Sequence, residues 1–236
     1  MKYKMLTLLF AVISMSLNSQ SFIGAWESYD LDNDGNKLKN VVIFADGYQA
    51  SVWFNAETGA FIKTNGGSWS LNASTFSEII EFDSENPDNV GMEVSFEVFN
   101  EGDVMGIIGE DRKWKRIDAG QPGQLQGAWL MSGRIRNGET QLRDTNRPRK
   151  TMKILSGTRF QWIAYNTETK QFMGTGGGSY TTVDGKYTEN IEFFSRDNSK
   201  TGLSLKFDFE LKNEDWHHSG LSSKGDPIHE IWSKRN

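Results

Sequence analysis

Two glutamates have the clearest potential for chemistry, because each interrupts an apolar row in a predicted strand. Side chains alternate between the two faces of a strand, so positions two apart share a face. In FSEIIEF and YTENIEF this rule gives two expected inward-facing rows, Phe76, Glu78, Ile80 and Phe82, and Tyr187, Glu189, Ile191 and Phe193. A carboxylate among apolar groups is costly unless it is paired or hydrogen-bonded. Glu78 and Glu189 are therefore interpreted either as polar anchors for a ligand or as structural groups, capped by an interior Lys, Tyr or Trp or reached by water.

Other residue types give less support for catalysis or metal binding. The chain has no Cys, which excludes thiol catalysis. Its 3 His are His217, His218 and His229. Their spacing matches no metal-ligand motif, and residues 30–35 (DLDNDG) lack the distal Glu of a calcium loop. Because no nucleophile motif or phosphate-binding loop is present either, we expect a non-enzymatic protein without metal or cofactor.

The charge of the chain argues against nucleic acid as a partner. Its formal net charge is −5 at pH 7, whereas nucleic-acid-binding domains are usually basic. The segment 134–153 is locally basic and unpatterned. It could bind an anionic ligand or polysaccharide, but such a charge run is also typical of a solvated loop.

The first residues have the features of a secretory signal peptide. Lys2 and Lys4 precede the apolar run MLTLLFAVISMSL, which the polar stretch NSQS follows. The apolar run is too short for a comfortable membrane span. We expect residues 1–20 to be removed and the protein to be exported to the periplasm or the extracellular space. Because no Cys follows the signal, lipid attachment is not expected.

The rest of the chain is an internal duplication. At one constant offset, Ile43–Val98 aligns without gaps onto Ile154–Phe209, and NAETGAFIKTNGGSW is matched by NTETKQFMGTGGGSY. The motif GAW occurs near the start of each copy, and WKR or WSKR near its end. These repeats predict one domain over residues 21–118, a linker over 119–126 and a second domain over 127–236.

Both copies have the pattern of antiparallel strands. EVSFEVF (93–99) and SLKFDFEL (204–211) alternate apolar and polar residues, as half-buried strands do. Each copy divides into about eight short strands separated by turns, and no segment shows a helical period. The sequence therefore predicts an all-β protein made of two tandem, small, antiparallel up-and-down β-barrels.

Glycines stand inside one predicted strand of each copy rather than at its turn. They are Gly66 and Gly67 in the first copy and Gly177 and Gly178 in the second. Glycine within a strand marks a bend, a bulge or the close approach of another group, and a small barrel must bend its strands sharply. The missing side chains are also expected to open space beside Glu78 and Glu189, which makes these glycines candidate pocket residues.

GAW at the start and a basic residue in the last strand of each copy resemble the lipocalin and calycin group. Within that group, the chain looks closer to the compact lipocalin-like domains of uncharacterised secreted bacterial proteins than to typical lipocalins. The resemblance implies that Trp26 and Trp129 close the barrel bases and that a basic residue packs across each. Arg116 matches that residue in the first copy, and either Lys234 or Arg235 matches it in the second. The copies are shorter than typical lipocalins and lack the disulfide of the family.

Three functions follow from this pattern, in decreasing order of support. The first is a binding protein that holds a small apolar or amphipathic ligand in one or both barrels. The second is a protein-protein interaction module with filled barrels, which uses its outer surface, the 134–153 segment or the groove between the domains. The third is an enzyme with an interior Glu as general base. No membrane insertion is expected, and the sequence leaves the oligomeric state open.

Overall fold

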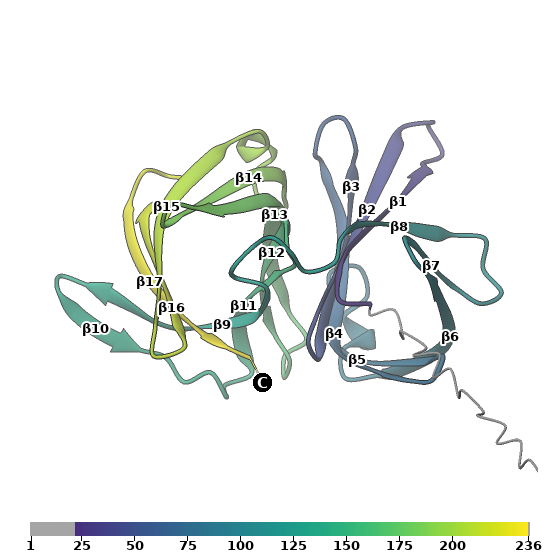
Figure 1. The fold of residues 1–236 in the computed structure, drawn as a ribbon, viewed down its shortest axis with the longest axis horizontal. Coiled ribbons are helices and arrows are strands. Elements are labelled where there is room, and N and C mark those ends of the chain that lie inside the picture. The colour runs from purple at the N-terminus through teal and green to yellow at the C-terminus, as the bar shows by residue number, and fades with distance from the viewer. Residues whose placement is uncertain (1–21, 236) are drawn as a thin grey trace, which may run out of the picture.

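The computed structural model describes residues 22–235, which form two closed antiparallel β-barrels side by side (Figure 1). The predicted fold class is therefore confirmed. The predicted signal peptide lies outside the described residues. Within residues 22–235, no helix has the length and apolar character to cross a membrane.

Barrel 1 is a simple meander in which every strand pairs with the next and the last pairs with the first. Its strands are β1 (Gly24–Leu31), β2 (Lys37–Ala45), β3 (Tyr48–Asn55), β4 (Phe61–Asn72), β5 (Thr75–Asp83), β6 (Glu93–Glu101), β7 (Val104–Ile107) and β8 (Lys113–Asp118). A short 3-10 helix, η1 (Pro87–Asn89), lies between β5 and β6. Because β8 closes on β1, the pairing leaves no open sheet edge in this barrel.

Barrel 2 repeats this order and adds one strand. Its strands are β9 (Gly127–Arg136), β10 (Glu139–Leu142), β11 (Arg149–Leu155), β12 (Arg159–Asn166), β13 (Phe172–Val183), β14 (Lys186–Phe194), β15 (Ser204–Lys212), β16 (Asp215–Leu221) and β17 (Pro227–Lys234). The 3-10 helix η2 (Asn198–Lys200) lies between β14 and β15. Pairing of β17 with β9 closes the barrel, and β10 is the additional strand, paired with β9.

The basic segment 134–153 is largely exposed, as its charge suggested, but it is not all loop. It contains the end of β9, all of β10 and the start of β11, so much of it is strand. The β9–β10 hairpin projects away from barrel 1 (Figure 1). At the other end of the segment, Lys153 is buried inside barrel 2.

The strand glycines mark a bulge in each barrel. The register between β4 and β5 shifts at Gly66/Gly67, and that between β13 and β14 shifts at Gly177/Gly178. A Cβ on Gly67 would lie 1.9 Å from the carbonyl oxygen of Ile79, so the glycine allows two backbones to touch. The bulge is thus present, but the missing side chains make room for neighbouring backbone and not for open space beside Glu78.

The bulge also changes which side chains point inward. An extra residue in one strand inverts the alternation beyond it. Phe82 and Phe193 were expected to face the barrel interiors, but both belong to the apolar cluster between the two barrels. There the ring of Phe82 lies 5.0 Å from that of Tyr165, and the ring of Phe193 lies 5.0 Å from that of Phe54.

The barrels contact each other through equivalent surfaces, in an approximately twofold arrangement. Phe54 and Tyr165 are equivalent in the duplication, as are Phe82 and Phe193. The approximate twofold rotation that relates the barrels therefore exchanges the two ring contacts. At the axis, Phe61 stacks on its own equivalent, Phe172, with ring centroids 6.0 Å apart. The outward faces of β2, β3, β11 and β12 fill most of the remaining cluster, where they are almost fully buried. This shared core joins the two halves of the chain.

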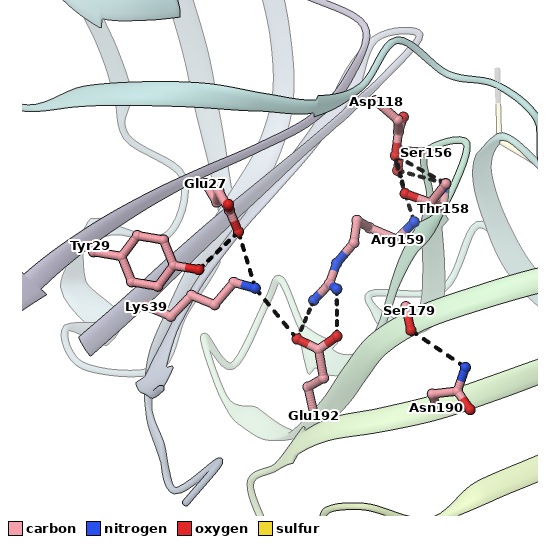
Figure 2. Close-up of polar contacts among 10 residues, drawn as sticks. All are labelled: Glu27, Tyr29, Lys39, Asp118, Ser156, Thr158, Arg159, Ser179, Asn190 and Glu192. Carbon is pink, nitrogen blue, oxygen red and sulfur yellow. Dashed lines mark hydrogen bonds and ion pairs between the residues drawn. The ribbon is translucent and has the colours of Figure 1, made fainter. Parts of the chain in front are cut away.

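Polar contacts surround the shared core. Arg159 of barrel 2 holds Glu192 with two charged hydrogen bonds, and Lys39 of barrel 1 reaches the same carboxylate at 3.7 Å (Figure 2). Asp118, the last residue of β8, accepts hydrogen bonds from the Ser156 Oγ and Thr158 Oγ1 hydroxyls at 2.7 and 2.6 Å. The end of barrel 1 is therefore tied directly to the β11–β12 turn of barrel 2.

Candidate ligand-binding site

Barrel 1 contains a cavity of about 540 Å³. Its walls are mainly apolar and aromatic, with side chains from β2 to β8. The lining includes the side chains of Val42, Gln49, Phe76, Glu78, Met105 and Trp114. A cavity of this size, whose mainly apolar walls also carry polar groups, is typical of a site for a small organic molecule.

Glu78 is the buried acid of this cavity. Its side chain projects inward from β5, and the residue is only 6% exposed. Burial raises the pKa of Glu78 to about 7, and the nearby carboxylates of Asp83 and Glu81 add to the rise. The hydrogen bond from Gln49 opposes it, because it stabilises the ionised form. Near neutral pH, Glu78 is therefore poised between its neutral and charged forms.

Gln49 is the only side chain of residues 22–235 that has a hydrogen bond with Glu78. Its Nε2 donates to Glu78 Oε1 over 2.6 Å. Its own Oε1 is buried and has no hydrogen-bond partner among the described residues. A buried acceptor without a donor is costly, so the cavity offers an unused acceptor beside the carboxyl group.

Another polar part of the wall, around Trp114 and Asn40, is internally satisfied. Trp114 Nε1 donates to Asn40 Oδ1 over 2.6 Å. Asn40 Nδ2 in turn donates to Ser51 Oγ and to the carbonyl oxygen of Val52, each at 2.9 Å. These contacts fix the indole of Trp114 as a flat apolar surface. The unmet hydrogen-bonding capacity is thus on the Glu78 side.

Charged residues line the more exposed part of the cavity. Lys63 pairs with Glu85 at 2.8 Å, and Arg112 pairs with Asp30 at 2.9 Å. The Arg112 guanidinium also lies 4.7 Å from the ring centre of Trp53. Such exposed ion pairs contribute little stability. They mean, however, that both cations at the rim are already paired with carboxylates.

The base of barrel 1 is closed by Trp26. Its Nε1 donates to the carbonyl oxygen of Phe22 over 2.8 Å, and the Phe22 ring packs inside against Phe44. The guanidinium of Arg116 lies 3.9 Å from the Trp26 ring centre. This is the contact that the lipocalin resemblance implied, although the contact alone does not establish that family.

In barrel 2, Lys234 takes the register position of Arg116. Trp26 pairs with Arg116 across the sheet, and Trp129 pairs with Lys234. Arg235 points instead to barrel 1, where it pairs with Glu81 at 2.7 Å and lies 3.9 Å from the ring centre of Tyr48. Of the two predicted candidates, Arg235 is thus an interface residue.

The interior of barrel 2 is packed with side chains. Trp129, Tyr187, Trp216 and Trp232 are almost completely buried in one aromatic cluster. Among them, Lys153 Nζ lies 2.7 Å from Glu189 Oε1. Of the interpretations given for Glu189, the structural one fits this geometry, because an interior Lys caps the carboxylate.

A second buried pair lies nearby in barrel 2. His218 Nδ1 is 3.3 Å from Glu230 Oε2, and the imidazole packs against Phe207 and Trp216. Burial lowers the pKa of His218, and the charge of Lys153 lowers it further. No group of three or more metal-ligating side chains occurs among residues 22–235.

The predicted site residues separate into distinct regions. Phe76, Glu78 and Ile80 line the cavity of barrel 1. Tyr187, Glu189 and Ile191 belong to the packed side of barrel 2. The four strand glycines do not line the cavity: a Cβ on Gly66 would meet Phe82, and one on Gly177 would meet Phe193, both in the shared core between the barrels.

Sequence reasoning missed Gln49, Trp53 and Trp114. In YQASVWFN (β3), Gln49, Ser51 and Trp53 face the cavity, while the more apolar set Ala50, Val52 and Phe54 faces barrel 2. The alternation of polar and apolar residues along β3 is visible in the sequence. The usual rule places the apolar face inside the barrel, and for this strand that rule selects the wrong face.

A groove of about 540 Å³ also lies between the barrels. Its lining includes Tyr29, Lys39 and Glu192, and Lys39 bridges Glu27 at 3.1 Å and Glu192 at 3.7 Å (Figure 2). The central charges of this groove, Lys39 and Glu192, are therefore already paired.

Comparison with protein families gives a match over the second half of the chain. Residues 124–236 match the sequence model of a domain of unknown function (DUF4488). This range covers barrel 2. No curated protein matches the chain. Barrel 2 is thus similar to this domain family, whose description names no activity.

Proposed function

We propose that the protein is a non-enzymatic binding protein that holds one small amphipathic molecule in barrel 1. The observation that carries the proposal is the cavity of about 540 Å³, with a buried carboxyl group and an unpaired amide oxygen set in apolar walls. The walls would bury the hydrocarbon part of a ligand, and the two oxygens would orient its polar end. Barrel 2 would serve as the packed structural partner.

The same proposal includes export of the protein. The basic start and short apolar run of residues 1–20 support it. In that setting the protein would bind its ligand in the periplasm or outside the cell. The lipocalin resemblance, with its implied ligand cup, is consistent with this role and is part of the proposal.

The test is to fill the cavity with a side chain that barrel 2 already uses. Met105 lines the cavity, and its equivalent in barrel 2 is Trp216. We expect protein purified from its own host to carry a small molecule in native mass spectrometry, and Met105→Trp to lose it. Val104→Trp is the matched control, because Val104 is the next residue of β7 and is exposed.

The outcome separates the two leading functions. Loss of the ligand in Met105→Trp but not in Val104→Trp would support binding inside the barrel. If both variants and the parent carry no small molecule, and none of them binds an apolar fluorescent probe, binding inside the barrel fails. An interaction module that uses the outer surface would then be the better explanation.

A further inference from the structure

Barrel 2 has a buried lysine, Lys153, at a position where barrel 1 has no charged side chain. Lys153 lies between Trp129 and Trp162 in the β-sheet register, and Val42 lies in the same way between Trp26 and Ser51. The two positions are therefore equivalent. In barrel 2 a lysine side chain extends into the interior, whereas in barrel 1 the shorter Val42 lines the open cavity.

The lysine ammonium occupies a defined site in barrel 2. Lys153 Nζ is 2.7 Å from Glu189 Oε1. It also lies 5.1, 5.0 and 5.2 Å from the ring centres of Tyr187, Trp216 and Trp232. A carboxylate combined with aromatic rings at this distance is a favourable environment for a buried cation.

Barrel 1 retains most of that site without the cation. The equivalents of Glu189 and Tyr187 are Glu78 and Phe76, and Trp114 has the register position of Trp232. Trp216 is replaced by Met105, which leaves room. All four of these barrel 1 side chains line the cavity.

We propose that the ligand of barrel 1 is an organic amine, whose ammonium group binds Glu78 in the place that Lys153 Nζ takes in barrel 2. The hydrocarbon part of the amine would lie along the apolar walls toward the rim. The inference rests on the proposed function, and it adds the chemical class of the ligand.

The polar groups of the cavity favour an amine over an acid. Glu78 and the unpaired Gln49 Oε1 are both acceptors, and an ammonium group supplies donors to both. A carboxylate ligand would place a second negative charge beside Glu78 without a cation to compensate. The other charged groups that line the cavity are Lys63, Asp83, Glu85, Glu110 and Arg112. Of these, the two cations are paired with Glu85 and Asp30.

The experiment compares three probes of equal chain length by titration calorimetry on the full chain at pH 8. The probes are octylamine, 1-octanol and octanoate. We expect octylamine to bind at least about tenfold more tightly than 1-octanol, which is about the difference between a charged and a neutral hydrogen bond. Octanoate is expected to bind least.

Two variants locate the ammonium group. Glu78→Gln is expected to reduce octylamine affinity to the level of 1-octanol and to leave 1-octanol affinity within about twofold. Val42→Lys would place a tethered ammonium on Glu78 and is expected to abolish octylamine binding. Val42→Met is its control of similar length without charge and is expected to keep the preference for the amine.

The possible failures are distinct. If the parent protein binds all three probes equally, or if Glu78→Gln keeps the amine preference, the amine inference is overturned while a binding cavity remains. If no probe binds and Met105→Trp behaves as the parent does, the inference and the proposed function both fail. Glu78→Gln gives a decisive result even if Val42→Lys does not fold.

Discussion

The two barrels share a fold and a buried glutamate but differ in what surrounds it. In barrel 1, Glu78 has a neutral amide partner and borders a cavity of about 540 Å³. In barrel 2, Glu189 has a lysine partner inside an aromatic cluster. The same position on the same strand therefore borders a cavity in one copy and is paired with a lysine of the chain in the other.

The difference shows how one barrel can be hollow in a stable protein. An unfilled interior loses packing contacts. The filled core of barrel 2 and the shared apolar surface between the barrels offset that loss, because both are almost fully buried.

Removing the internal cation of barrel 2 should cost the most stability. Lys153→Met leaves Glu189 buried without a counter-charge, so we expect the free energy of unfolding to fall by up to about 5 kcal/mol. Denaturant unfolding at pH 7 measures the loss. In the double variant Lys153→Met/Glu189→Gln most of it should be recovered, since no charge remains to be paired. A loss below about 1 kcal/mol in the single variant would contradict the role given to Lys153.

Truncation of the shared core should cost nearly as much from either side. Phe82→Ala and Phe193→Ala each remove a ring that is 1% exposed, and each should lower the free energy of unfolding by about 4 kcal/mol. Because the two positions are equivalent in the twofold arrangement, the losses should agree closely. Phe96→Ala, in the cavity wall, should cost clearly less, because that side chain already borders open space. A larger loss for Phe96→Ala would mean that the cavity is not open.

Strand order and the division into two barrels could be predicted from the sequence because duplication and alternation are local signals. In EVSFEVF and SLKFDFEL the alternation of apolar and polar residues predicts which side chains are exposed. The internal repeat predicts where each copy begins. The inward position of Glu78 followed from the same rule, because it precedes the bulge in β5. Phe82 lies beyond the bulge, where the alternation is inverted, so the same rule predicted the wrong face for its side chain.

The rest of the site depends on what lies outside each barrel. The apolar face of β3, with Ala50, Val52 and Phe54, is buried against barrel 2, so its polar face is free to line the cavity. No property of β3 alone shows that a second domain covers it. Likewise, Lys153 lies in a basic run that looks solvated, and only the barrel closure shows that its ammonium reaches Glu189.

The pH dependence of stability should report the burial of Glu78. Burial raises the pKa of Glu78 from 4.5 to about 7, so the folded state favours its proton. The stability contribution is complete below pH 4.5 and is lost as the pH rises to about 7. Glu78→Gln has no such loss, so its advantage over the parent should grow by about 3 kcal/mol between pH 4 and pH 8. Denaturant unfolding at both pH values measures this change, and a constant difference would mean that water reaches Glu78.

The barrel bases should show the smallest effect of the comparison. Arg116 stacks on Trp26, with its guanidinium 3.9 Å from the ring centre, and donates to the Gly102 carbonyl oxygen. Arg116→Lys gives barrel 1 the basic residue that barrel 2 has at Lys234. It should lower the free energy of unfolding by about 1 kcal/mol, because an ammonium group cannot keep both the flat contact and the forked hydrogen bonds.

The reciprocal change sharpens the same point. Lys234→Arg should change the free energy of unfolding by no more than about 0.5 kcal/mol, because Lys234 is exposed and its surroundings were not shaped around a guanidinium group. Thermal and denaturant unfolding of the two variants side by side measures both effects. If the two changes were equal and opposite, the bases would be interchangeable. The asymmetry expected here instead follows from the contacts that Arg116 makes with Trp26 and with the Gly102 carbonyl oxygen at the base of the hollow barrel.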